Sequence, residues 1–317
     1  MDLPQLRTII HVAELGSLSK AADRLHIAQP ALSRQVRLLE AELGTRLFER
    51  HGRGMVVTEA GQGVLRHAYR ILAEVQDIRA SVAEDDVSLS GHVSIGMPPT
   101  VADILAAPLV SALQHRHPLA TLRIVSAYSS YVLDWLHRGE IDVAILFESK
   151  GARSLRSTPL LEEDLHLIGT DDARLSPETA VRFDTLATAK LLLPSTGHSL
   201  RTLLDGCMRG LDFALKVQVE ADSFSVLKDL VRRRQGMTIL PLAPVLDDIS
   251  SGALCYAPLV NPTPKRRLMM SFPADRPSTR LAQSAGRALV ETVADLVERQ
   301  AWPARLLCER RTGRSSR

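Results

Sequence analysis

Residues 29–37 include four polar side chains whose chemistry suits the recognition of base pairs: Gln29, Ser33, Arg34 and Arg37. Arginine and glutamine form bidentate hydrogen bonds with purine edges in the major groove of DNA, and serine can bond to either kind of base. The spacing places these side chains on one side of a helix, and Pro30 suits its first turn because proline has no N–H to leave unpaired there. We therefore expect a helix that begins near Pro30 and turns this polar face toward a DNA groove.

An apolar face opposite these side chains indicates how the helix is held. Its members recur at spacings of four, three and four residues, and Gly44 supplies the left-handed residue that commonly ends a helix. Ser17 is a good N-cap for a shorter helix that runs to Leu25. Two helices that meet across a short turn form a helix-turn-helix, whose second helix enters the major groove. The expected buried face consists of Leu32, Val36, Leu39 and Leu43.

The segments on either side complete a winged helix-turn-helix. Residues 3–15 have the period of a preceding helix, and residues 46–57 have the pattern of a strand, a turn and a second strand. Arg50 and Arg53 lie at this turn, where they suit DNA phosphates or a minor groove and carry no sequence information by themselves. Residues 1–58 contain eight Lys/Arg against six Asp/Glu, so specific contacts and dimerisation must supplement a modest electrostatic attraction to DNA.

A long helix is expected next, from Thr58 as its N-cap to residue 83, and it would span about 39 Å. Its apolar residues follow heptad spacing, which predicts that two copies pair along it and present two recognition helices to two half-sites. The alternative is an amphipathic helix that lies on its own domain. Polar residues 81–92 then form a linker. The expected seam consists of Val64, Ala68, Ile71, Val75, Ile78 and Val82.

Beyond residue 92 the pattern changes to strands that alternate with helices, which predicts a parallel sheet with right-handed crossovers. In such sheets ligands bind beyond the carboxyl ends of the strands, where helix N-termini offer free N–H groups and a positive dipole end. Three such places occur, and together they suit a small anionic or polar effector. The alternative for each hydroxyl is a cap on its own helix. The candidate effector-binding residues are Pro99, Thr100, Ser129, Phe147, Ser195, Thr196 and His198.

Composition and missing motifs exclude several classes of protein. The chain has 317 residues, of which 45% are hydrophobic and 24% charged, and this suits two or three globular domains. No apolar run is long enough to cross a membrane and no signal peptide is recognisable, so we expect a cytoplasmic protein without a membrane partner. Cys207, Cys255 and Cys308 show no metal-ligand or disulfide spacing. No nucleotide-binding or nucleophile motif occurs, so we expect neither a cofactor nor an enzyme.

The resemblance to a known family is carried by LRTIIHVAELGSLSKAADRLHIAQPALSRQVRLLEAELGTRLFERHGRGMVVTEAG. This stretch is similar to the winged helix-turn-helix of LysR-type transcriptional regulators, within them the subgroup of the nitrogen assimilation control regulator. The resemblance implies that Gln29, Pro30, Ser33 and Arg34 lie at the groove and that Arg50 and Arg53 belong to the wing. A further resemblance, to the effector domain of that subgroup, is carried by VSIGMPPTVADIL, HPLATLRIVSAYSSYVLDWLHRGEIDVAILF and LLLPSTGHSLR. It implies the two-lobed, type II fold of periplasmic binding proteins.

We therefore expect an α/β protein that binds double-stranded promoter or operator DNA and responds to a small-molecule effector bound between two lobes. One alternative is a DNA-binding regulator whose lobes serve only oligomerisation, and another is a solute-binding protein or an enzyme on the same fold. Self-association to a dimer is expected, the resemblance implies a tetramer, and RNA polymerase is a further expected partner. The expected parts are residues 1–58 (DNA-binding domain), 59–90 (linker and dimerisation helix), 91–302 (effector domain, with lobe I over 91–165 and 267–302 and lobe II over 166–266) and 303–317 (a basic, disordered tail).

Overall fold

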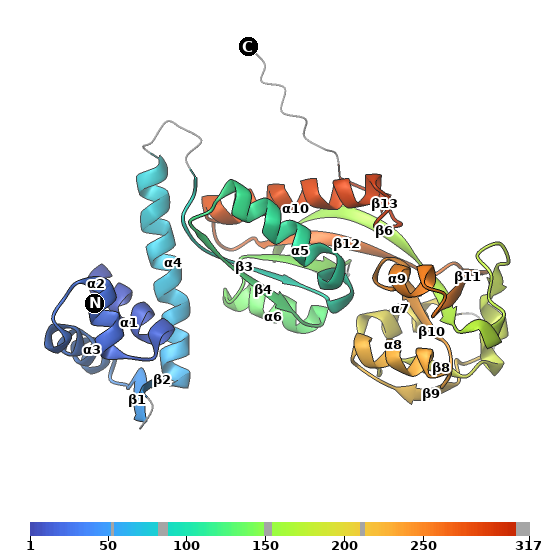
Figure 1. Ribbon diagram of the computed structural model, residues 1–317, viewed down its shortest axis with the longest axis horizontal. Coiled ribbons are helices and arrows are strands. Elements are labelled where there is room, and N and C mark those ends of the chain that lie inside the picture. Colours follow the sequence, from blue (N-terminus) through green and yellow to red (C-terminus); the bar gives the residue numbers. More distant parts are fainter. Residues whose placement is uncertain (52–53, 82–87, 149–153, 210–212, 309–317) are drawn as a thin grey trace, which may run out of the picture. The chain divides into compact units, whose positions relative to one another are not determined.

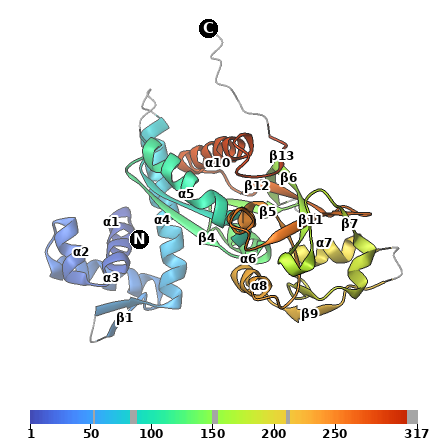
Figure 2. The same ribbon diagram turned by 45° about the vertical axis from the view of Figure 1, so that its right-hand side comes forward.

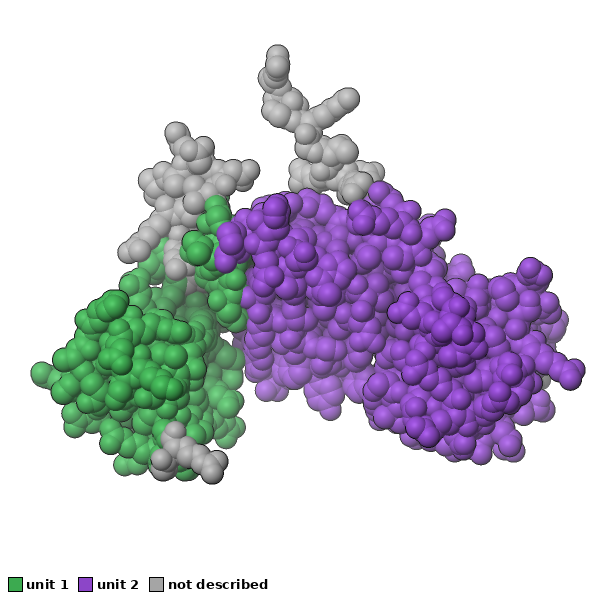
Figure 3. Space-filling view, viewed as in Figure 1, with its two compact units in different colours: residues 1–92, 119–121, 279–281 green, residues 93–118, 122–278, 282–317 purple. Residues whose placement is uncertain are grey.

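The structure is a computed structural model that describes residues 1–51, 54–81, 88–148, 154–209 and 213–308. The chain divides into two compact units, which Figure 3 shows in different colours. Unit 1 is made of residues 1–92 with two short segments, 119–121 and 279–281, and unit 2 contains the remainder. No helix in the described part of the chain is long and apolar enough to cross a membrane.

Three helices of unit 1 form the expected helix-turn-helix: α1 (Leu3–Leu15), α2 (Leu18–Leu25) and α3 (Gln29–Leu43). The side chain of Ser17 accepts the N–H of Lys20 at the start of α2. Gly16 and Gly44 end α1 and α3 in the left-handed conformation, which glycine adopts without steric cost. The local capping chemistry therefore determines where the predicted helices begin and end.

The core of unit 1 confirms three of the four residues expected on the buried face of α3. Leu32, Val36 and Leu39 are buried, whereas Leu43 is 39% exposed and its predicted burial is wrong. The reason lies in the last turn, where Glu40 accepts the backbone N–H groups of Leu47 and Phe48 at 2.8 and 3.2 Å. These residues continue the core after Gly44, so the final turn of α3 contributes no further buried side chain.

The wing consists of the antiparallel strands β1 (Phe48–His51) and β2 (Gly54–Val57). Its second strand is tied to the helices because the N–H of Met55 donates to the carbonyl oxygen of Gly16 at 2.8 Å. After the wing, Thr58 accepts the N–H of Gly61 at 3.0 Å and so caps α4 (Glu59–Ser81), as expected.

The helix α4 packs on its own unit along a face that includes two residues of the expected dimer seam. Ala68 is fully buried in the core of unit 1, and Val64 packs partly against it. The prediction that Ala68 contacts a second chain is therefore wrong. Among the described side chains of α4, the large apolar ones that are exposed are Ile71 and Ile78, at 39% and 61% exposure. Val75 is half-buried, and Val82 lies outside the described residues.

Unit 2 begins with the expected βαβαβ order, in which β3 pairs parallel with β5. The expectation of a parallel sheet is wrong for the later strands, because β12 returns along the chain to pair antiparallel with both β5 and β6. We call this part lobe I; its strands follow the order β4-β3-β5-β12-β6. In Figures 1 and 2 the helices α5 and α10 lie on one face of this sheet and α6 on the other. The elements are β3 (Gly91–Met97), α5 (Pro99–Arg116), β4 (Ala120–Ser126), α6 (Ser129–Arg138), β5 (Val143–Phe147), β12 (Lys265–Pro273) and α10 (Arg280–Glu298).

The long strand β6 (Leu155–Gly169) joins lobe I to a second group of elements, which we call lobe II. Its residues up to Asp164 pair with β12, and its residues from Leu165 onward pair with β10 and β11. The chain returns between β11 and β12. Lobe II contains η1 (Asp171–Ala173), β7 (Val181–Arg182), η2 (Phe183–Thr188), β8 (Leu191–Leu193), α7 (Ser199–Cys207), β9 (Val217–Glu220), α8 (Phe224–Arg232), β10 (Thr238–Pro241), η3 (Ala243–Val245), α9 (Leu246–Ser250) and β11 (Cys255–Val260). A short β13 (Arg305–Leu306) pairs with β6, so the expectation that the tail is disordered is wrong for these residues; residues 309–317 lie outside the described part of the chain.

Candidate functional site

The polar face of α3 is accessible, as the spacing of its residues predicts. Gln29, Pro30, Arg34 and Arg37 are exposed and Ser33 is half-buried. At the wing, Arg50 is exposed on β1; Arg53 lies outside the described residues. Within the part of the chain that the structure describes, the guanidinium groups of Arg34, Arg37 and Arg50 form no ion pair. Their hydrogen-bond donors are therefore available to a ligand with acceptor groups, such as a nucleic acid.

Polar contacts behind this face hold α3 and its neighbours together. The hydroxyl of Thr8 on α1 donates to Gln35 on α3 at 2.5 Å. Glu14 on α1 accepts from Arg24 on α2 at 2.7 Å and from the hydroxyl of Tyr69 on α4 at 3.2 Å. Burial and the carboxylate of Glu14 raise the pKa of Tyr69 to about 12. One carboxylate thus joins three helices of unit 1.

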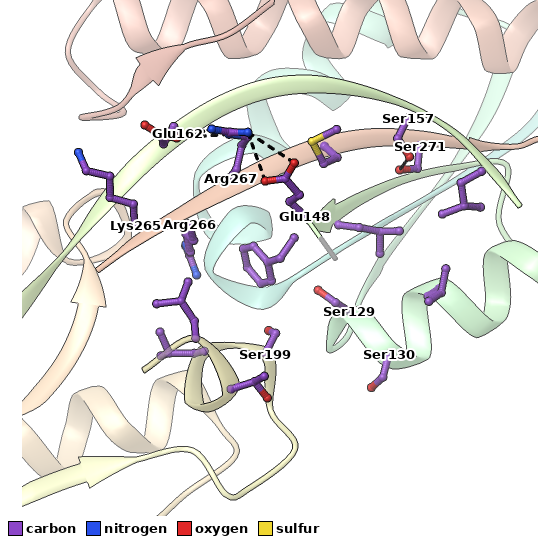
Figure 4. A pocket seen from close by; sticks show the side chains of 18 residues that line it. Ser129, Ser130, Glu148, Ser157, Glu162, Ser199, Lys265, Arg266, Arg267 and Ser271 are labelled. Atoms are coloured by element: carbon purple, nitrogen blue, oxygen red, sulfur yellow. Dashed lines mark hydrogen bonds and ion pairs between the residues drawn. The ribbon is translucent and has the colours of Figure 1, made fainter. Parts of the chain in front are cut away.

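A small cavity of about 40 Å³ lies between the two lobes of unit 2. Four helices begin at its wall: α5 at Pro99, α6 at Ser129, α7 at Ser199 and α8, through Phe224. It shares several residues with a larger cleft of about 1140 Å³. Figure 4 shows this cleft, with Ser129 and Ser199 on opposite sides and with ion pairs from Arg267 to Glu148 and Glu162 above them.

The four helix N-termini differ in whether their backbone N–H groups already have a partner. In lobe II, the Nδ1 atom of His198 accepts the N–H of Leu200 at the start of α7, and Ser223 caps α8. In lobe I, Pro98 and Tyr128 occupy the N-cap positions of α5 and α6, and neither forms a side-chain cap. Lobe I therefore presents two uncapped helix N-termini, each with the equivalent of about half a positive charge, to the cavity.

A buried arginine completes this side of the cavity. Arg266, on β12, is 6% exposed. Its Nε donates to Glu163 at 2.5 Å and its Nη2 donates to the hydroxyl of Thr100 at 3.1 Å. Its guanidinium group lies 4.6 Å from the centre of the Phe147 ring, within the range of a cation–π contact. Because the ion pair and the ring fix the guanidinium, its remaining N–H groups are pre-organised to bind an acceptor.

Tyr128 of lobe I and His198 and Asp222 of lobe II form another part of the wall. The Tyr128 ring meets that of His198 edge to face, with 4.6 Å between their centres. Burial lowers the pKa of His198, and burial together with the carboxylate of Asp222 raises the pKa of Tyr128. Asp222 itself accepts both the backbone N–H and the hydroxyl of Ser195, and these bonds lower its pKa. Near neutral pH the wall thus combines a neutral histidine, a neutral tyrosine and a carboxylate.

Five of the seven residues proposed for effector binding line this cavity: Pro99, Thr100, Ser129, Phe147 and His198. Ser195 and Thr196 line neither cavity. The hydroxyl of Ser195 donates to Asp222, which does line the small cavity. Among the described residues, no group of His, Cys, Asp and Glu side chains could hold a metal ion.

The sequence reasoning missed Arg266 and Asp222. A signal for Arg266 existed in two charged triplets of opposite sign. Glu162, Glu163 and Asp164 on β6 stand opposite Arg267, Arg266 and Lys265 on β12, and each facing pair forms an ion pair. Antiparallel strands with such complementary triplets place the pairs side by side.

A winged helix-turn-helix followed by two α/β lobes with a cleft between them defines a DNA-binding regulator with an effector-binding domain. The chain belongs to the LysR family of transcriptional regulators. Residues 3–62 match the family model of the bacterial regulatory helix-turn-helix protein, lysR family, and residues 87–294 match that of the LysR substrate binding domain. The fold and the function expected from the sequence are therefore confirmed.

Relatives and a solved structure agree with this assignment. The nitrogen assimilation regulatory protein nac of Klebsiella aerogenes is 33% identical over 76% of this chain and 78% of its own length. The hydrogen peroxide-inducible genes activator of Pectobacterium carotovorum subsp. carotovorum is 30% identical over 94% of this chain and 96% of its own. The structure of the C206 mutant of OxyR from Corynebacterium glutamicum is 27% identical, covers 94% of both chains and has a TM-score of 0.68.

Proposed function

We propose that the exposed face of α3 reads base pairs and that the wing binds the DNA backbone. The free guanidinium groups of Arg34 and Arg37, together with Gln29 and Ser33, supply the donors and acceptors that distinguish base edges in the major groove. Arg50 on β1 supplies a positive charge for DNA phosphates, and this contact does not depend on the base sequence.

The test compares Arg34→Ala with Arg50→Ala on an operator selected from random DNA and on a scrambled duplex. Arg34→Ala is expected to cost about 1–3 kcal/mol on the operator and to relax the preference at one base pair. Arg50→Ala should weaken both duplexes alike and reduce the dependence of binding on salt. Equal losses for Arg34→Ala on both duplexes would show that this residue does not contact a base.

We further propose that the cavity between the lobes binds a small effector through an anionic group, such as a carboxylate. The observation that carries this proposal is the meeting of two uncapped helix N-termini, α5 and α6, with the buried guanidinium of Arg266. Thr100 and Ser129 add hydroxyl groups at the same place, and the side-chain oxygen of Ser129 is buried without a hydrogen-bond partner among the described residues. We assign binding rather than catalysis to this set of donors.

Binding can be measured as stabilisation, because a ligand at 100 times its dissociation constant adds about 2.7 kcal/mol to the free energy of unfolding. A panel of small carboxylates, with matched amides as uncharged controls, is expected to give shifts for the carboxylates alone. Thr100→Val should weaken the best ligand about tenfold or more, since a hydrogen bond to a charged group contributes roughly 1.5–3 kcal/mol. Equal shifts with acids and amides would contradict an anion site.

The alternative is that the lobes support oligomerisation without a ligand. In that case no member of the panel stabilises the chain, and Thr100→Val leaves both stability shifts and DNA binding unchanged. An effector can alter DNA binding only if its affinity differs between two arrangements of the protein, so the same panel should be repeated with operator DNA bound.

A further inference from the structure

Trp302 follows α10 and lies 1% exposed in the core of unit 2. Its backbone N–H donates to the carbonyl oxygen of Leu296 at 3.0 Å, and its indole Nε1 donates to the Oε2 atom of Glu163 at 2.9 Å. Burying an indole N–H is costly unless it finds an acceptor, so this bond fixes the relation between the ring and the carboxylate.

Glu163 connects Trp302 with the cavity, since its other oxygen accepts from Arg266 at 2.5 Å. Glu163 and Arg266 are both buried, at 2% and 6% exposure, so the pair is shielded from water. The series continues from Arg266 to the hydroxyl of Thr100 at the first turn of α5. Four side chains from four separate segments thus form one series of hydrogen bonds, which ends at the cavity.

The segment after Trp302 is attached to the same strand. Arg305 and Leu306 form β13 against Glu162 and Leu161 of β6, beside which β13 is drawn in Figure 1. Arg305 donates to Glu162 at 2.7 Å, and the N–H of Leu307 donates to the carbonyl oxygen of Leu160 at 2.8 Å. Trp302 is therefore held from both sides and can serve as a fixed reference for Glu163.

We propose that Trp302 is a positioning residue of the effector site, which acts through Glu163 on the guanidinium of Arg266. The proposal rests on the anion site proposed above. A carboxylate that is bound by arginine alone can turn with it, whereas a second donor on the other oxygen restricts both partners. Groups behind a binding residue commonly set its orientation in this way.

The direct test measures hydrogen exchange at the Nε–H of Arg266 by NMR on the full chain without ligand, with Arg266→Lys to assign the resonance. Trp302→Phe retains a ring but removes the donor, and it is expected to speed this exchange at least tenfold. The matched control is Trp135→Phe, since Trp135 is the second of the two tryptophans in the chain. Unchanged exchange in Trp302→Phe overturns the proposal. If that variant folds poorly, Glu163→Gln replaces it, because the amide nitrogen that takes the place of one carboxylate oxygen cannot accept a hydrogen bond and leaves one of the two donors without its acceptor.

The effect of Trp302 on anion binding is measured with acetate as the ligand. Trp302→Phe is expected to raise its dissociation constant about tenfold, and Trp135→Phe to leave it unchanged. Faster exchange with unaltered acetate binding overturns the role of Trp302 in the site. If the wild-type chain does not bind acetate or any other carboxylate of the panel, the anion site is contradicted, while the exchange measurement still decides whether Trp302 positions Arg266.

Discussion

At the scale of single residues, protonation of His198 is expected to alter the wall of the cavity. Its neutral ring accepts the N–H of Leu200 through Nδ1, and burial lowers its pKa below the usual 6.5. The unfolded chain therefore takes up a proton at His198 before the folded chain does, and stability falls as the pH drops below about 6.5. Protonation of Nδ1 also removes the acceptor that caps α7.

The prediction is that His198→Asn reduces this loss of stability, because asparagine can cap a helix and does not titrate. Between pH 7.5 and 5.5 the free energy of unfolding should fall less in the variant, by about 1 kcal/mol, the usual contribution of a cap. Urea unfolding at both pH values measures it. His166→Gln is the matched comparison, since burial also lowers the pKa of His166 without a capping role in the described structure. If the free energy of unfolding falls equally in wild type and His198→Asn, His198 does not cause the loss of stability at low pH.

The candidate site shows what residue types alone can predict. The hydroxyls at helix N-termini were found because a helix start has a local signature, and Thr100, Ser129 and His198 indeed lie at one cavity. Arg266 was missed because its role depends on which strand lies opposite β12, and strand pairing is not local. Ser195 was predicted to bind the effector because the sequence does not reveal that its hydroxyl is bound to Asp222, which follows it by 27 residues.

At the scale of elements, the wing depends on a close approach between two backbones. Gly54 has φ +138°, and a Cβ atom there would lie 2.4 Å from the carbonyl oxygen of Gly16. That oxygen is the one that accepts the N–H of Met55. A side chain at position 54 must therefore either push the wing from α1 or distort the strand.

We predict that Gly54→Ala lowers the free energy of unfolding by about 1–3 kcal/mol, the usual cost of a strained backbone position. Gly63→Ala is the matched control, because it lies inside α4, where the nearest atom to an added Cβ is 3.8 Å away. Alanine there should raise stability by up to about 1 kcal/mol. Thermal unfolding of both variants measures whether each substitution lowers or raises stability. An unchanged stability of Gly54→Ala would mean that the wing does not depend on the close approach of Gly54 to Gly16.

The helix α4 shows the limit of periodicity. Heptad spacing predicted its apolar residues, but a helix that packs on its own domain and a helix that pairs with a second chain have nearly the same period. Ala68 and Leu65 belong to the buried face of α4. His67, Ile71 and Ile78 form an exposed face beside it on the same helix. Which of the two faces is buried depends on where α1 packs, and the sequence of α4 alone contains no information about α1.

At the scale of the whole molecule, DNA binding and effector binding lie in different units of one chain. If α3 reads base pairs as proposed, one chain covers one half-site, and a second copy is needed for a site with two-fold symmetry. We therefore propose that the exposed face of α4 pairs with that of a second chain. Its large apolar side chains, Ile71 and Ile78, are the ones a soluble monomer would leave in water.

Ile78→Asp in the full chain tests this pairing, because a charge buried without a partner between two helices is strongly unfavourable. Sedimentation velocity should show at least a tenfold weaker association, and operators with two half-sites should lose affinity while single half-sites do not. Val56→Asp is the matched control for the sedimentation experiment alone, since Val56 is exposed to a similar degree, 52% against 61%, on the wing, where an added charge also acts on DNA. An unchanged dimer in Ile78→Asp would place the interface on another surface, and equal dissociation in Val56→Asp would show that added charge alone separates the chains.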